Sequence, residues 1–209
     1  MALLLIFSVV AAAAIGRFSQ CRRPVRPILT GAAMILVGGC LLAQLIRPAL
    51  LPTFERDAAA IWSGQVYRLF TALWFQDGGW KGGLFNLAVL AFVGAAAERL
   101  WDRRICSIVY LVGGVASEIV ALWWQPIGAG NSIAWMSLAG AVLVKGLPAR
   151  EPPAVRLAGL AGLAAGLLLA VQTDIHGIAL LIGAGLGSAF LRFSERDRLR
   201  RPDAEPAGV

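Results

Sequence analysis

Three polar residues have side chains that could carry out nucleophilic chemistry together: Ser132, His176 and Asn86. A serine hydroxyl is a poor nucleophile until a neighbouring base accepts its proton, and an imidazole titrates close enough to neutral pH to do so. The oxyanion that forms next needs hydrogen-bond donors, which a side-chain amide or the free N–H groups at a helix start can supply. The residue types therefore provide a candidate nucleophile, base and oxyanion donor.

These three residues lie at one depth when each is measured from the basic residue that ends its apolar block. The intervals are 13, 13 and 16 residues, counted from Arg99, Lys145 and Arg192. With a helical rise of about 1.5 Å per residue, all three lie about 20–24 Å above the inner boundary of a membrane. In a hydrocarbon core roughly 30 Å thick, that is about 6–10 Å below the outer surface.

Each residue also has a simpler interpretation. A Ser that follows Asn at a helix start is most often an N-cap, and a single His near a helix end is usually structural. Asn86 could bond a neighbouring helix. Glu118 lies at a similar depth, where it could tune His176 or serve a proton pathway, but a hydrogen-bonded structural carboxyl is simpler. Asp174 precedes His176 by two residues, where helix capping is the simpler role.

The elements that carry these residues are long apolar blocks. The chain is 58% hydrophobic, with a mean hydropathy of +0.73. Membrane-spanning helices need about 20 mostly apolar residues, and only helices or closed barrels satisfy their backbone groups in lipid. The composition predicts an all-α integral membrane protein. The blocks lie near 2–16, 28–46, 83–97, 106–124, 131–147, 157–172 and 175–191.

The net charge of +7 does not indicate a nucleic-acid partner, because the basic residues lie in the gaps between apolar blocks. Basic residues concentrate on the cytoplasmic side of membrane proteins. If the gap at 17–27 is cytoplasmic, 15 of the 19 Lys and Arg residues lie inside. A signal peptide carries its positive charge in front, but here the charge follows the first block. We therefore expect a retained helix with its N-terminus outside and a cytoplasmic C-terminus.

The chain divides into three predicted segments. Residues 1–27 form a short hydrophobic helix and a cytoplasmic basic loop. Residues 28–192 form a core of six transmembrane helices, in which the long outer segment 47–82 is too polar to span and lies in the interface. Residues 193–209 are polar and form a disordered cytoplasmic tail. We expect no cofactor and no metal, because the single His leaves too few ligands for a metal cluster.

Five ordered motifs resemble those of the rhomboid family of intramembrane serine proteases. The run at 64–75 is similar to the family's first-loop motif, in which an aromatic–Arg pair (Arg68 here) precedes a Thr. The other four are residues 80–87 with Asn86, the pair Glu98-Arg99, the run Gly130-Asn131-Ser132, and His176 with Ala179, Gly183 and Gly187 beneath it. The similarity spans about residues 28–191.

The resemblance implies a Ser–His dyad without a third carboxylate. Ser132 would attack the scissile carbonyl, and His176 would act as base and then as acid. Asn86, with Gly130 and Asn131 in an auxiliary role, would stabilise the oxyanion. The residues with a structural role would be Arg68, Glu98, Ala179 and Gly183. Gly130 would face Ala179, which would bring the nucleophile and the base within reach.

Two positions depart from the family pattern. The family His four residues before Asn86 is Gly82 here, and Ile133 replaces the Gly that follows the nucleophile. The leading hypothesis is a bacterial cell-membrane protease that cleaves single-pass transmembrane proteins. The alternatives are a rhomboid-like protein that binds membrane clients without cutting them, and a small transporter that uses Glu118.

Overall fold

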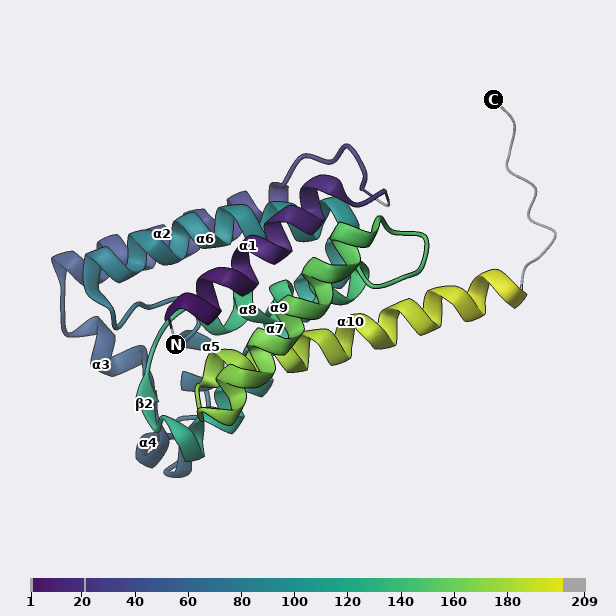
Figure 1. Ribbon diagram of the computed structural model, residues 1–209. Helices are drawn as coiled ribbons and strands as arrows, with labels where there is room; N and C mark the ends of the chain where they lie inside the picture. Colours follow the sequence, from purple (N-terminus) through teal and green to yellow (C-terminus); the bar gives the residue numbers. More distant parts are fainter. Residues whose placement is uncertain (1, 21, 201–209) are drawn as a thin grey trace.

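The computed structural model describes residues 2–20 and 22–200, and this part of the chain is mainly helical (Figure 1). By length and composition, five of its helices could cross a membrane, while α1 and α8 are shorter apolar helices. The expected all-α membrane class is confirmed. The long helices are α1 (Ala2–Phe18), α2 (Ile28–Ile46), α6 (Gly79–Leu100), α7 (Arg103–Trp124), α8 (Ser132–Lys145), α9 (Pro153–Val171) and α10 (Ile175–Arg200).

The outer segment folds into short elements that gather at one end of the bundle (Figure 1). A two-residue strand in this segment pairs antiparallel with a second one that follows α7, with Arg56 opposite Gly128. This pairing fastens the outer segment to the loop that leads into α8. The short elements are α3 (Leu50–Phe54), β1 (Arg56–Asp57), α4 (Ala58–Trp62), α5 (Arg68–Thr71) and β2 (Ile127–Gly128).

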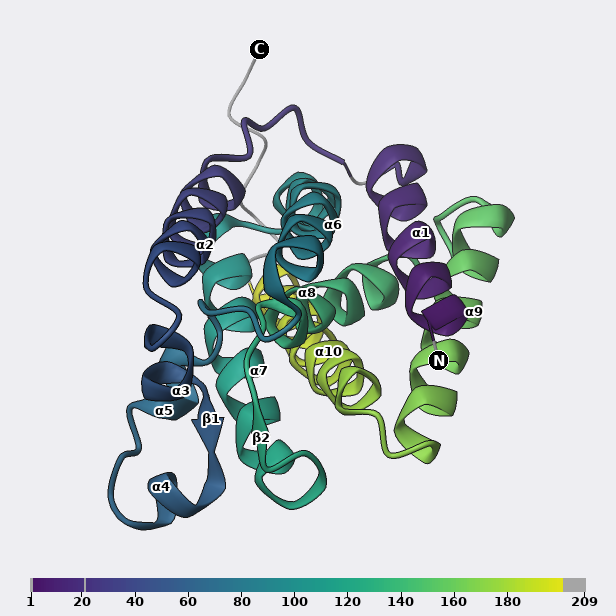
Figure 2. The same ribbon diagram turned by 90° about the vertical axis from the view of Figure 1, so that its left-hand side faces the viewer.

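Helix α8 lies in the centre of the bundle, and α1, α6, α7, α9 and α10 pack against it (Figure 2). Every residue from 133 to 144 is buried. Because α8 is enclosed by protein, it does not need the length of a lipid-exposed span. Its first residue therefore lies inside the bundle, where a non-helical loop is tolerated because protein surrounds it.

The close contact between α8 and α10 depends on glycines. A Cβ added at Gly183 would overlap the carbonyl oxygen of Ser137, and one added at Gly140 would overlap the carbonyl oxygen of Leu180. Small residues let helix backbones approach in this way. The hydroxyl of Ser137 also donates to the carbonyl oxygen of Ala179 at 3.1 Å, so Ala179 lies in the same seam.

The expectation that Gly130 faces Ala179 is wrong. The atoms nearest to a Cβ at Gly130 belong to Ser132 and Asn86. The reason is that the backbone N–H of Gly130 donates to the carbonyl oxygen of Ala72 at 2.9 Å, which holds this residue on the side of the outer segment.

Glu98 and Arg68 each fasten one segment to another. Glu98 is buried near the end of α6, and its carboxylate accepts from the backbone N–H and the hydroxyl of Thr30, both at 2.7 Å. It thereby caps the start of α2, whose first N–H groups have no helical partner. The Arg68 guanidinium donates to the carbonyl oxygens of Pro52 and Glu55, each at 2.9 Å, and so ties α5 to α3.

Two predicted boundaries differ from the structure. Helix α6 begins at Gly79, not at 83, so the outer segment ends at 78. Helix α10 continues to Arg200, so the described part of the predicted disordered tail is helical, and 201–209 lie outside the described residues. Arg, Leu and Glu favour helix, and no Gly or Pro follows Gly187 before Arg200.

Helix α1 packs against α6, α8 and α9, and Figure 2 shows it between α6 and α9. A Cβ at Gly16 would overlap Ala96 of α6. Beyond the helix, the hydroxyl of Ser19 donates to the buried carboxylate of Glu151 at 2.9 Å, next to the start of α9. The N-terminal block is therefore part of the packed bundle.

Candidate active site

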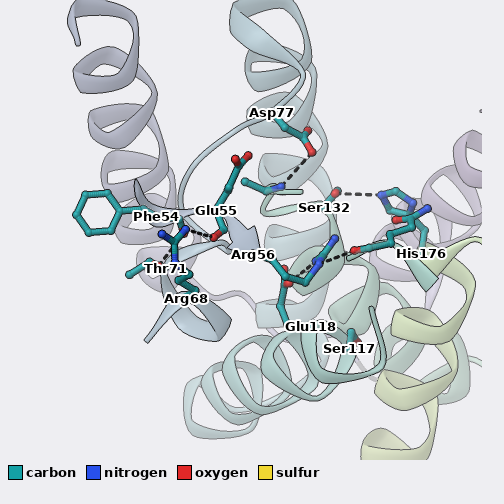
Figure 3. A network of polar contacts seen from close by, with 12 residues as sticks. Phe54, Glu55, Arg56, Arg68, Thr71, Asp77, Ser117, Glu118, Ser132 and His176 are labelled. Atoms are coloured by element: carbon teal, nitrogen blue, oxygen red, sulfur yellow. Dashed lines mark hydrogen bonds and ion pairs between the residues drawn. The ribbon is translucent and has the colours of Figure 1, made fainter. Parts of the chain in front are cut away.

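The Ser132 hydroxyl and the His176 imidazole are within hydrogen-bond distance, with 3.0 Å between Oγ and Nε2 (Figure 3). Ser132 is the first residue of α8 and His176 is the second residue of α10, so the glycine seam between these helices sets their separation. The hydroxyl does not cap α8, because Asn131 is the N-cap residue and makes no side-chain cap bond. Both residues are partly exposed, and the His176 side chain keeps 25% of its surface.

The other imidazole nitrogen contacts a carboxylate. Nδ1 of His176 lies 2.7 Å from Oδ1 of Asp174, and the same oxygen accepts the His176 backbone N–H at 3.0 Å. Asp174 therefore caps α10, as the simpler interpretation expected, and also contacts the ring. Burial of the Asp174 carboxyl favours a higher pKa, but the hydrogen bonds and charge of His176 outweigh it and hold that pKa below its usual range.

The turn before Asp174 has a strained backbone. Thr173 has a φ of 57°, a left-handed conformation that is unfavourable for a β-branched residue. Its N–H donates to the carbonyl oxygen of Ala170, and the N–H of Asp174 donates to that of Leu169, at 2.9 and 3.0 Å. This is a Schellman motif that ends α9, with Thr in the place that Gly usually takes. The motif turns the chain so that Asp174 begins the next helix.

On the opposite side of Ser132, Asn86 is already hydrogen-bonded. Its Nδ2 donates to Oε1 of Gln76 at 2.8 Å. Gln76 is buried in turn, and its backbone N–H and carbonyl oxygen both bond the side-chain amide of Gln44. Gln76 thus orients the Asn86 amide, and one of the two N–H groups of this amide already donates a hydrogen bond.

Gly130 leaves open the space between the Asn86 amide and Ser132. A Cβ there would lie 3.2 Å from Ser132 Oγ and 3.9 Å from Asn86 Nδ2. Asn131 is fully buried, and its carbonyl oxygen accepts the N–H of Trp135. Its position is that of a structural residue at the start of α8 rather than of an exposed donor.

The two departures from the family pattern differ in their surroundings. A Cβ at Gly82 would meet nothing within 4 Å, so this position, one helical turn before Asn86, offers open space and no donor. Ile133 is buried within the hydrophobic core, where its side chain packs among apolar residues.

Arg56 and Glu118 form a buried ion pair beneath the outer loops (Figure 3). The Arg56 Nε also donates to the carbonyl oxygen of Gln125 at 2.8 Å. The Glu118 carboxylate therefore bonds Arg56, and no bond between it and His176 is recorded in the described part of the chain. Asp77 makes a second bond to this loop, because its Oδ2 accepts a hydrogen bond from the backbone N–H of Ala129 at 3.0 Å. Together these bonds hold the loop that leads into α8.

Gln76, Asp77 and Arg56 are site residues that the sequence did not reveal. All three lie in the outer segment, where polar residues are ordinary and follow no helical period. The one available signal was the proximity of Gln76 and Asp77 to the start of α6. In the part of the chain that the structure describes, no group of three His, Cys, Asp or Glu residues could hold a metal ion.

The helices and the site define a multi-pass membrane protein that carries a serine–imidazole pair inside its bundle. The family model described as Rhomboid domain matches residues 63–193. The chain belongs to the rhomboid family, whose members are usually intramembrane serine proteases. No curated protein and no solved structure matches the chain significantly.

Proposed function

We propose that this protein is an intramembrane serine endopeptidase that uses Ser132 and His176. The observation that carries the proposal is the 3.0 Å contact between Ser132 Oγ and His176 Nε2, because reach between nucleophile and base is the first geometric requirement. Membership of the rhomboid family supports the same reaction class.

In the first half-reaction, Ser132 Oγ bonds the scissile carbonyl carbon while its proton moves to Nε2 of His176. The carbonyl electron pair moves onto oxygen, and this oxyanion lies toward Asn86 and the N–H groups at the start of α8. The oxyanion then collapses and the C–N bond breaks. The leaving amine takes the proton from Nε2, and the acyl group stays on Ser132.

In the second half-reaction, water attacks the acyl carbon and gives a proton to Nε2. The Ser132–carbon bond breaks, Oγ recovers the proton, and a carboxylic acid leaves. Such general acid–base transfer contributes typically 10²- to 10⁴-fold in rate. No dissociable cofactor takes part in either half.

The proposed substrates are single-pass transmembrane proteins. The site lies at the start of α8, inside the bundle, so a substrate must present its backbone at that depth in the membrane. A helical substrate hides its carbonyls in intrahelical bonds, so cleavage should favour a segment that Gly or Pro makes easy to unwind. The distribution of Arg and Lys supports a cytoplasmic C-terminus, and the Ala-, Arg- and Gly-rich composition supports a bacterial cell membrane.

Covalent labelling of the purified protein by a serine-directed fluorophosphonate probe tests this function. Labelling of wild type is expected, with none for Ser132→Ala and a loss of about 10²- to 10⁴-fold for His176→Ala. Ser117→Ala is the matched control, because this buried hydroxyl bonds only the Gly113 carbonyl oxygen of its own helix among the bonds recorded. Equal labelling of wild type and Ser132→Ala would remove the basis for proteolysis.

Gly82 motivates one alternative, a family member that binds membrane clients without cutting them, because an oxyanion donor is missing there. A single-pass reporter distinguishes the two. Cleavage by wild type and not by Ser132→Ala supports the protease. Co-purification of intact reporter with an unlabelled wild type supports the alternative.

A further inference from the structure

The contact between Asp174 and the imidazole assigns that carboxylate more than a capping role. One oxygen, Oδ1, lies 3.0 Å from the His176 backbone nitrogen and 2.7 Å from its Nδ1. A cap alone needs only the first bond. The carboxylate is buried, with 6% of its side chain exposed, and a buried carboxylate forms its strongest bonds with a charged or strongly polar donor.

A neutral imidazole holds one proton, and the bond that one nitrogen makes decides which nitrogen holds it. A carboxylate accepts hydrogen bonds and does not donate them. With Asp174 at Nδ1, the proton lies on Nδ1 and the lone pair of Nε2 faces Ser132. This is the one neutral tautomer in which Nε2 can accept the serine proton.

We propose that Asp174 is a positioning residue that fixes the tautomer and orientation of His176 by accepting a hydrogen bond from Nδ1. The site is then a Ser132–His176–Asp174 triad rather than a dyad, and this rests on the proposed function. Asp174 stays ionised while Nε2 gains and returns the serine proton, so its charge also stabilises the imidazolium.

The strained turn supports this assignment independently. A left-handed φ is unfavourable for Thr173, and such strain persists where the surrounding structure requires it. It sets the direction in which Asp174 enters α10. Among the described helices packed against α10, the charged residues on α8 and α9 are Lys145 and Arg156, which lie toward the other end of the bundle, and Glu118 of α7 is paired with Arg56.

Two variants separate the two roles of Asp174. Asp174→Ser keeps a good N-cap but is too short to reach Nδ1. Asp174→Asn keeps both an N-cap and an acceptor oxygen, without the charge. The chain has one His, so ¹⁵N-histidine NMR of protein purified without a polyhistidine tag reports His176 alone. Thermal unfolding of both variants should match wild type if their caps are intact.

The expected wild-type spectrum shows the proton on Nδ1, and Asp174→Ser shows it shared between Nδ1 and Nε2. Fluorophosphonate labelling should fall at least about tenfold in Asp174→Ser and by an intermediate factor in Asp174→Asn. The same tautomer and labelling rate in wild type and Asp174→Ser would overturn the proposal. Failure of the proposed function looks different: wild type would not label, while the NMR spectra would still report the role of Asp174.

Discussion

The two sides of Ser132 differ in how many of the contacts that the proposed reaction needs are already formed. On the α10 side, the hydroxyl, the imidazole and a carboxylate are already in contact, and two glycines lock the helices that carry them. On the α6 side, Asn86 has one N–H engaged by Gln76, and Gly82 contributes no side chain. In the proposed mechanism, the proton-transfer half of the site is therefore assembled before substrate arrives, whereas the oxyanion half depends on a single amide and on backbone N–H groups.

In the proposed mechanism, we expect oxyanion stabilisation rather than proton transfer to limit the rate. Proton transfer requires only that one short contact be kept, and helix packing keeps it. Oxyanion stabilisation requires donors already aimed at a charge that is absent in the ground state. We infer that removing Ser132 or His176, or displacing α10 from α8, causes the largest losses, whereas changes on the α6 side alter the rate moderately and in both directions.

Outside the Ser132–His176 pair itself, the largest effect should come from Gly183→Val, which breaks the assembled side. The new side chain overlaps the carbonyl oxygen of Ser137 and pushes α10 away from α8. A displacement of about 1 Å costs roughly 10²-fold, so labelling of Ser132 should fall by at least that factor. Fluorophosphonate kinetics measure it. Gly185→Val is the matched control, since a Cβ there meets nothing within 4 Å, and equal loss in both variants would contradict the explanation.

Asn86→Ala should have the next largest effect, on the incomplete side. Loss of a dedicated oxyanion donor costs about 10²- to 10³-fold, and this amide is partly engaged elsewhere, so we expect a fall in kcat of about tenfold to 10²-fold. Cleavage of a single-pass reporter measures kcat and KM separately, and KM should hardly change. Phe85→Ala, an exposed neighbour on the same helix, should keep its rate. An unchanged kcat in Asn86→Ala would show that backbone N–H groups suffice.

Gly82→His should raise the rate of reporter cleavage, because it adds a donor to the incomplete α6 side. The position is open, so an imidazole can be accommodated, and it lies one helical turn from Asn86. We expect an increase in reporter cleavage of about fivefold to tenfold, less than a fully aligned donor supplies. Gly82→Ala adds the same Cβ and a higher helix propensity without a donor, and its rate should stay at the wild-type level. An equal rise in both variants would assign the gain to helix stability.

Much of the assembled side was accessible from the sequence, because it depends on helix lengths. Apolar blocks fix the spans, and a regular rise of 1.5 Å per residue places Ser132 and His176 in one layer. The contact of Asp174 with the ring was missed for a physical reason. Its oxygen makes the capping bond that was expected, and nothing in the spacing reveals that Oδ1 also reaches Nδ1.

The incomplete side was less accessible, because its neighbours come from loops. Gln76 bonds Gln44 near the end of α2, and Asp77 bonds Ala129 in the loop before α8. Such loop geometry follows no periodic pattern in the sequence. The same limit explains the error at Gly130. The family resemblance suggested a partner on α10, but a backbone bond to Ala72 turns Gly130 toward α6.

Thr173→Gly should have the smallest effect. It tests whether the backbone strain at Thr173 helps to assemble the α10 side. Glycine adopts a left-handed φ without steric cost but has more freedom when unfolded, so the protein should gain about 0.5–1 kcal/mol of stability. Thermal unfolding measures this gain. If the strained turn also directs Asp174 toward the ring, the gain should accompany a twofold to threefold slower labelling of Ser132, because the looser turn lets the carboxylate leave Nδ1. Gln172→Gly changes a residue with φ −81° and should only destabilise. A gain in stability with an unchanged labelling rate would mean that the strain is incidental to the site.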